Sequence, residues 1–196
     1  MSQPLHQSQV RNLALIALGS NATSSAGGPQ ATLFAAISAL GEIEGRVVKS
    51  SQLFETPCFP AGAGPDFVNA AVCFETVLCA KELLANLHSI ERSFGRKRLT
   101  RWGQRTLDLD LLGFGDEVIP NRAEFLRWHD LPGDSQAKEA PDQLILPHPR
   151  MQDRGFVLVP LAEVAPDWIH PVLGQSVAQM LAALDPAEIR DVRPLG

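Results

Sequence analysis

The chain has 196 residues, of which 45% are hydrophobic and 20% are charged, and its formal net charge is −5. This length suits one domain with a real hydrophobic core, and the acidic balance argues against a general binder of nucleic acid or of an anionic membrane surface. Three cysteines without CxxC spacing are typical of reduced thiols in a cytoplasmic protein. Residues 1–12 are polar and are expected to form a disordered tail, which leaves residues 13–196 as a single domain.

The expected elements begin with an apolar run, Leu13–Leu18, that predicts a buried strand and is far too short to span a membrane. After two glycines and a proline, apolar residues at helical spacing predict a helix that ends at Gly41. The β-rich stretch 46–54 predicts a second strand. The alternating stretch Phe67–Thr76 predicts a third strand, with residues such as Val68 and Val72 on one face.

The segment 80–94 predicts a helix whose apolar residues recur at helical spacing. With the strand that follows near residue 108, the order is strand, helix, strand, strand, helix, strand, which indicates an α+β ferredoxin-like sandwich. The polar segment 120–143 lacks an apolar period and exceeds the usual loop length, so it is expected to be a loop insertion. Helices near 156–163 and 176–184 are expected as C-terminal additions.

The strand Leu107-Asp108-Leu109-Asp110 carries the main chemical signal. Because a strand alternates its faces, Asp108 and Asp110 share one face while the leucines share the other. Two neighbouring carboxylates repel each other unless a cation lies between them. Six basic residues lie just upstream in a stretch of fourteen, namely Arg92, Arg96, Lys97, Arg98, Arg101 and Arg105. Oxygen ligands beside planar guanidinium groups suit a magnesium-bound polyphosphate, so the pattern predicts a nucleotide-dependent phosphotransfer enzyme.

Five motifs follow one another between residues 13 and 184. They are Leu18-Gly19-Ser20-Asn21, Glu55-Thr56-Pro57, Asp66-Phe67-Val68-Asn69-Ala70-Ala71, Arg101-Trp102-Gly103-Gln104-Arg105-Thr106-Leu107-Asp108-Leu109-Asp110, and Pro147-His148-Pro149 with Arg154-Gly155-Phe156. In these motifs the chain resembles the 6-hydroxymethyl-7,8-dihydropterin pyrophosphokinases of folate biosynthesis. The resemblance implies a ferredoxin-like fold and transfer of diphosphate from ATP to the pterin hydroxymethyl oxygen, with release of AMP.

The same resemblance implies a role for each matching residue. Asp108 and Asp110 would hold two Mg²⁺ ions that bridge the ATP phosphates, and Arg96 and Arg105 would clamp the phosphates as catalytic residues. The other ATP contacts would come from His88, Glu91, Arg98, Arg101, Trp102, His148 and Arg154. The pterin contacts would come from Gly19, Thr56, Pro57, Phe59, Phe67, Asn69, Trp102 and Phe156. The expected partners are these small molecules alone, bound by a stand-alone, cytoplasmic monomer with no nucleic acid and no membrane.

Two alternatives use the same residues differently. A ferredoxin-like module could bind a nucleotide or RNA without chemistry, but acidic groups on the open sheet would repel a phosphate backbone unless metal were present. A two-metal phosphohydrolase would use the aspartates to activate water, and the pterin-reading set of Phe67, Asn69 and Phe156 argues against it. A degenerate relative would lack a central carboxylate or clamp, and none is missing. The pyrophosphokinase is therefore the prediction.

Overall fold

The structure is a computed structural model that describes residues 11–58, 64–96, 105–132, 135 and 139–196. Its elements run in the order β1 (Asn12–Ser20), α1 (Pro29–Leu40), β2 (Gly45–Ser50), β3 (Phe54–Thr56), β4 (Phe67–Thr76), α2 (Ala80–Ser93), β5 (Asp108–Phe114), α3 (Arg122–His129), η1 (Met151–Asp153), α5 (Gly155–Val164), α6 (Val177–Ala183), α7 (Pro186–Ile189) and β6 (Arg193–Pro194). Within this described part, no helix combines the length and apolarity that crossing a membrane requires.

The sheet is antiparallel throughout, with the order β5-β1-β4-β3-β6 and with β2 also paired to β4. Because β2 and β3 pair with successive parts of β4, together they occupy one strand position. With that pair counted as one strand, the first six elements follow the βαββαβ order of a ferredoxin-like sandwich. The predicted fold class is confirmed.

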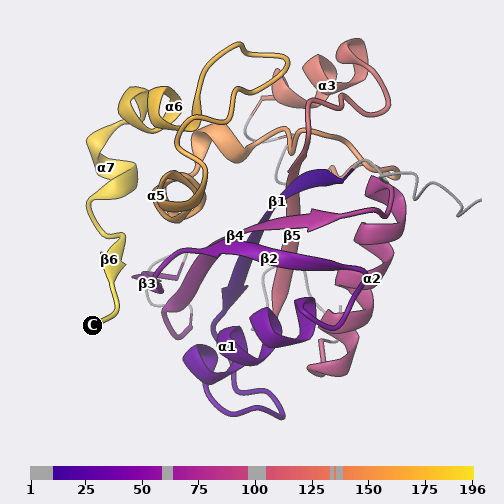
Figure 1. Cartoon of the computed structure of the whole chain (residues 1–196). Coiled ribbons are helices and arrows are strands. Elements are labelled where there is room, and N and C mark those ends of the chain that lie inside the picture. The colour runs from indigo at the N-terminus through magenta and orange to yellow at the C-terminus, as the bar shows by residue number, and fades with distance from the viewer. Residues whose placement is uncertain (1–10, 59–63, 97–104, 133–134, 136–138) are drawn as a thin grey trace, which may run out of the picture.

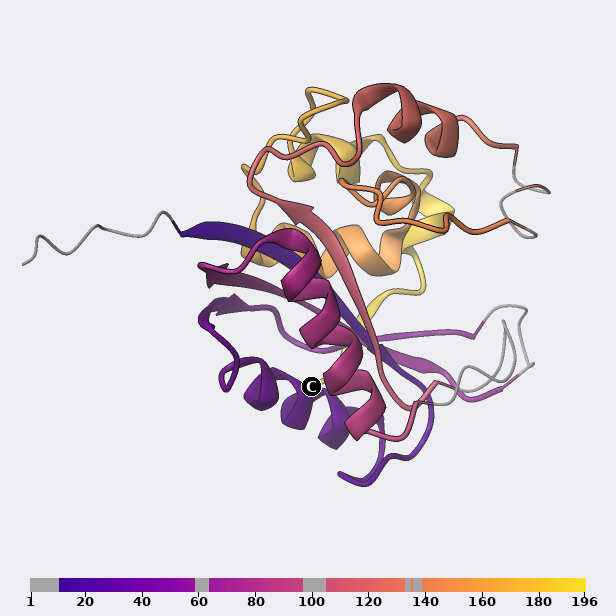
Figure 2. The same ribbon diagram turned by 90° about the vertical axis from the view of Figure 1, so that its right-hand side faces the viewer.

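Helices cover both faces of the sheet (Figures 1 and 2). Helices α1 and α2 pack on one face, where Leu83, Leu87 and Ile90 meet the strands at the i, i+4, i+7 spacing of an amphipathic helix. Helix α5 covers the opposite face, and α6 packs against α5. Strand β4 lies between both layers, so its side chains are buried alternately in one core and the other, as Val72 and Ala71 show. The sheet is therefore closed on both faces and open mainly at its edges.

Most predicted elements are confirmed, and three predictions need correction. The strand predicted over 46–54 is interrupted after Ser50, where the Ser51 hydroxyl oxygen accepts the Ala71 N–H (3.0 Å) in place of a ladder partner. The predicted tail overruns by one residue, because Asn12 already belongs to β1. Strand β6, which pairs with β3, is an additional strand that no local pattern in the sequence indicates.

The third correction concerns the predicted loop insertion, because Arg122–His129 is helix α3. The Asn121 side chain caps it by accepting the Glu124 N–H (2.9 Å), and Phe125 and Trp128 are buried one turn apart. A capping residue followed three positions later by Glu is a helix-start signature that the sequence does contain. The helix packs its buried rings on Ile145 and Val172 in a separate small core.

Candidate active site

Strand register builds a row of polar groups across the sheet. Gly19 in β1 is paired with Asp108 in β5 on one side and with Asn69 in β4 on the other. Paired side chains lie on one face, and here it is the face that α5 covers. A side chain at Gly19 would fill this row, since a Cβ there would lie 3.2 Å from Asn69 Oδ1. The glycine therefore leaves open space between the carboxylate and the amide.

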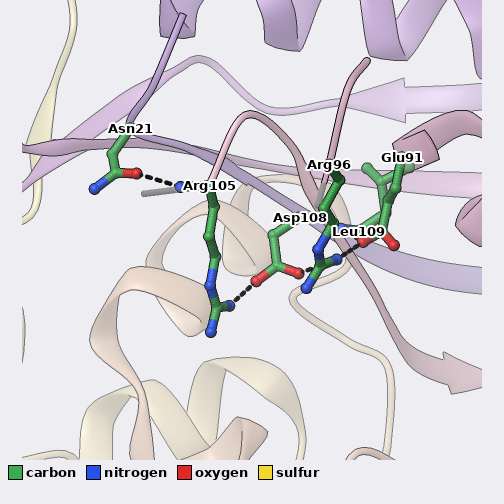
Figure 3. A network of polar contacts seen from close by, with 6 residues as sticks. All are labelled: Asn21, Glu91, Arg96, Arg105, Asp108 and Leu109. Carbon is green, nitrogen blue, oxygen red and sulfur yellow. Dashed lines mark hydrogen bonds and ion pairs between the residues drawn. The ribbon is translucent and has the colours of Figure 1, made fainter. Parts of the chain in front are cut away.

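Asp108 lies between two guanidinium groups (Figure 3). Arg96 Nη1 is 2.6 Å from Asp108 Oδ1, and Arg105 Nη1 pairs with Asp108 Oδ2. The backbone of Arg105 is held in turn by Asn21, whose side-chain oxygen accepts the Arg105 N–H at 2.8 Å. The turn after β1 thus positions one of the two arginines that the sequence assigns to catalysis.

Glu91 connects the end of α2 to the edge strand β5. Its Oε1 accepts the Leu109 N–H at 2.8 Å and also pairs with Arg96, which it presents to Asp108. The side chain is only 3% exposed, so these contacts form in a water-poor environment where charged hydrogen bonds are strong. Glu91 therefore acts as the anchor of Arg96 in this structure.

Burial and the neighbouring Asp110 carboxylate raise the pKa of Asp108 above its ordinary value, and the guanidinium groups of Arg105 and Arg96 oppose that rise. The charge of Asp108 is thus disfavoured although two arginines pair with it, so a further cation nearby would stabilise the carboxylate. Oxygen donors from two aspartates suit Mg²⁺, which is commonly held by one or two carboxylates while water and phosphate complete its shell. The donor set thus fits magnesium.

A cavity of about 300 Å³ opens beside this pair, between α2, β5 and the chain from 144 to 154. It is lined by seven of the predicted site residues, namely His88, Glu91, Arg96, Asp108, Asp110, His148 and Arg154. It is also lined by residues that the sequence did not assign, namely Trp128, Glu139, Ala140, Pro141 and Arg150. Among these residues, only Arg150 has a signal in the sequence, because it lies two residues after the predicted site residue His148.

His148 is held as a neutral ring. Burial, with the positive charges of Arg154 and Arg150, lowers its pKa to about 3. Its Nδ1 accepts the Arg150 N–H at 3.2 Å, so the proton of the neutral ring is on Nε2. The His148 N–H donates to the Leu112 carbonyl oxygen (2.8 Å), which ties the residue to β5. The ring can thus donate one hydrogen bond at neutral pH.

The predicted pterin residues gather at the other end of the polar row. Asn69 Nδ2 donates to Thr56 Oγ1 at 2.8 Å, and both residues are buried. Phe67 is the register partner of Thr56 and is half-buried, and Pro57 is exposed. Phe156, at the start of α5, is 41% exposed, and the Arg154 guanidinium lies 5.7 Å from its ring centre. The structure thus joins Gly19, Thr56, Asn69 and Phe67 into one patch.

Four predicted residues lie outside the described part of the chain, namely Phe59, Arg98, Arg101 and Trp102. Their assigned roles stay predictions.

Comparisons with known proteins identify the family of the chain. Residues 15–166 match the family described as 7,8-dihydro-6-hydroxymethylpterin-pyrophosphokinase (HPPK). The chain is similar to the 2-amino-4-hydroxy-6-hydroxymethyldihydropteridine pyrophosphokinase of Haemophilus influenzae, with 37% identity over 81% of this chain and 84% of that protein. The protein of the same name from Methylorubrum extorquens is 36% identical over 91% of this chain and 98% of its own length.

Two other comparisons cover only part of the matched protein. The Synechocystis protein of the same name is 42% identical over 66% of this chain, and the match spans about half of its length (56%). A solved Plasmodium falciparum HPPK-DHPS structure has a TM-score of 0.62 at 16% identity, and the match covers 91% of this chain and 45% of that one. At that identity the structural likeness supports the fold alone. The chain belongs to the 7,8-dihydro-6-hydroxymethylpterin-pyrophosphokinase family, and the predicted family and enzyme class are thereby confirmed.

Proposed function

We propose that the cavity and the polar row are the active site in which this chain transfers diphosphate from ATP to 6-hydroxymethyl-7,8-dihydropterin, as a step of folate biosynthesis. One observation carries the proposal. Asp108 lies where two different environments meet, with the arginine-lined cavity on one side and the Gly19–Asn69 row on the other. A transfer reaction needs its two substrates on opposite sides of the group that is transferred, and this arrangement supplies both sides.

Asp108 and Asp110 would hold the two magnesium ions. When bound, the metal supplies positive charge that neutralises the bridging and leaving phosphate oxygens. Arg96 and Arg105 are paired with Asp108 in this structure and would also turn their remaining N–H groups toward the phosphates. Arginine suits this task because its planar fork matches phosphate oxygens.

His148, Arg154 and Arg150 would complete the phosphate end of the cavity. The neutral His148 ring donates from Nε2, whereas the two arginines contribute charge. We assign Glu91 to the positioning of Arg96 rather than to direct nucleotide contact, because its Oε1 already receives two donors. His88 lies at the same cavity one turn earlier on α2 and would contact the nucleoside.

The pterin would bind against Asn69, Thr56 and Phe67, with Phe156 as the second ring of the stack. Asn69 is held by its Thr56 hydrogen bond, so its side-chain oxygen is fixed for reading a heterocycle edge. Gly19 would let the substrate approach the backbone beside Asp108. A loose phosphoryl transition state asks little proton abstraction of the protein, which is consistent with a site built from cations and carboxylates.

The test is AMP release from MgATP, measured with and without 6-hydroxymethyl-7,8-dihydropterin, in the wild type and in Asp110→Asn. Pterin-dependent AMP formation that the substitution lowers at least about 1000-fold would support the proposal, with the exposed Asp116→Asn as a charge-matched control that retains activity. ADP or inorganic phosphate as the product would instead indicate an ordinary kinase or a hydrolase. Tight ATP binding without turnover would indicate a binding module. We also propose that the enzyme is a monomer in the cytoplasm, and light scattering tests the oligomeric state.

A further inference from the structure

The cavity has a charged end and an apolar end. Glu91, Arg96 and Asp108 form the charged end, at the last turn of α2 and the start of β5. Leu84 and Leu111 lie at the other end, and the seven-residue step from Leu84 to Glu91 corresponds to about 10 Å along the helix. A ligand with a charged group at one end and a flat apolar group about 10 Å away would therefore match the cavity.

The apolar end is closed by Trp128 and residues 139–141, which belong to the predicted insertion 120–143, and the family resemblance assigns that insertion no role. Trp128 from α3 and the stretch Glu139–Pro141 line the cavity there, together with Leu144 and Ile145. Helix α3, which carries Trp128, lies outside the sheet and its two ferredoxin-like helices, on the side of the molecule where α5 and α6 lie (Figures 1 and 2). Trp128 and residues 139–141 thus supply one wall of the site.

Trp128 is held firmly in that wall. Its indole Nε1 donates to Glu124 Oε1 at 3.0 Å, and the Arg127 guanidinium lies 5.4 Å from the ring centre. The ring is 7% exposed and packs with Phe125 and Ile145. An aromatic ring that is fixed before the ligand arrives gives up little conformational entropy on binding. It is therefore well suited to contact a planar base.

We propose that this wall, Trp128 with residues 139–141, binds the purine base of the nucleotide, so that ATP affinity in this chain depends on these four residues. The inference rests on the proposed function for the identity of the ligand. Aromatic contact with a base is tolerant of its hydrogen-bonding edge, whereas the charged end recognises any magnesium polyphosphate. The wall should therefore influence binding of ATP and leave binding of inorganic tripolyphosphate unchanged.

The experiment uses two variants and one matched control. Ala140→Trp fills the apolar end from an exposed position, and Asp142→Trp places the same bulk two residues away at an exposed position that does not line the cavity. Trp128→Leu keeps an apolar side chain in the small core while it removes the ring. Titration calorimetry then gives the Kd of each protein for MgATP and for magnesium tripolyphosphate, and thermal unfolding checks that each variant is folded.

We expect both variants to weaken MgATP binding about tenfold, Trp128→Leu because one base–aromatic contact is lost and Ala140→Trp because the added indole occupies the place of the base. Tripolyphosphate affinity and the Asp142→Trp values should be unchanged. Equal MgATP affinity in Ala140→Trp and the wild type would overturn the inference. Parallel losses for ATP and tripolyphosphate would also overturn it, because they would indicate a general distortion of the site. Pterin-dependent AMP release by the wild type is scored separately, so its absence would refute the proposed reaction while the binding comparison still decides the role of the wall.

Discussion

Replacing Asp110 by asparagine should abolish activity and yet make the metal-free protein more stable. Asp110 shares a strand face with Asp108, and its charge is one of the causes that raise the Asp108 pKa. The substitution keeps the shape of the side chain and removes the repulsion. A residue retained for function in spite of such a cost is expected to show this opposition between stability and activity.

The expected change in the free energy of unfolding follows from the distance between the Asp108 and Asp110 carboxylates. Side chains two residues apart on a strand are separated by about 6.6 Å, since each residue advances the strand about 3.3 Å. Two unit charges at that distance repel by about 2.5 kcal/mol at an effective dielectric constant near 20, and by about 0.6 kcal/mol in bulk water. Both carboxylates are partly exposed, so we expect Asp110→Asn to raise the free energy of unfolding by about 1 kcal/mol, or Tm by about 2–4 °C.

The pH dependence of the stabilisation by Asp110→Asn provides a second check. The folded protein binds a proton at Asp108 more tightly than the unfolded chain does, so the repulsion costs stability most at high pH and is relieved as pH falls through the raised pKa of Asp108. The stabilising effect of Asp110→Asn should therefore be present at pH 8 and should vanish in acid. Urea unfolding in EDTA at several pH values measures it, and Mg²⁺ should stabilise the wild type more than the variant.

The control is Asp116→Asn, which removes the same charge from an exposed residue just beyond β5 and should change stability little. A loss of stability in Asp110→Asn without metal would refute the reasoning, because it would make Asp110 a structural partner and not a metal ligand. Full retention of pterin-dependent AMP release would refute the metal role directly.

Three further outcomes are expected. Gly19→Ala should raise KM for the pterin about tenfold while KM for ATP stays within about twofold, because the added methyl group would lie 3.2 Å from Asn69 Oδ1 and crowd the pterin side of the row. Steady-state kinetics with an unchanged pterin KM would contradict this placement. Glu91→Ala should cost about 3 kcal/mol in urea unfolding, because it strands the buried Leu109 N–H, whereas Glu91→Gln keeps an acceptor and should cost less than half as much. His148 has a pKa of about 3, below that of the unfolded chain, so its contribution to stability is lost as pH falls from about 6.5 toward 3, and His148→Gln should flatten this acid dependence in pH-dependent unfolding curves.

Features that depend on neighbouring residues are predictable from the sequence, whereas contacts between distant segments are not. Strand alternation alone placed Asp108 and Asp110 on one face and the leucines in the core, because neighbouring side chains on a strand point in opposite directions whatever surrounds them. Helical spacing placed Leu83 and Leu87 against the sheet for the same reason. The prediction misses helix α3 although its signal is local, because Asn121 and Glu124 stand in a polar stretch without an apolar helical period.

The shape of the site could not be predicted in this way. Gly19, Asn69 and Asp108 form one row only because of the pairing register of three strands, and register depends on packing between segments far apart in the sequence. The same holds for the hydrogen bond from Leu109 to Glu91 and for the cavity wall that includes Trp128. The sequence by itself determined the elements, the acidic pair and the motifs of the family, since these depend on local periodicity and residue chemistry. Only the tertiary structure decided which of those groups meet, because contacts between distant residues are set by how the two cores pack.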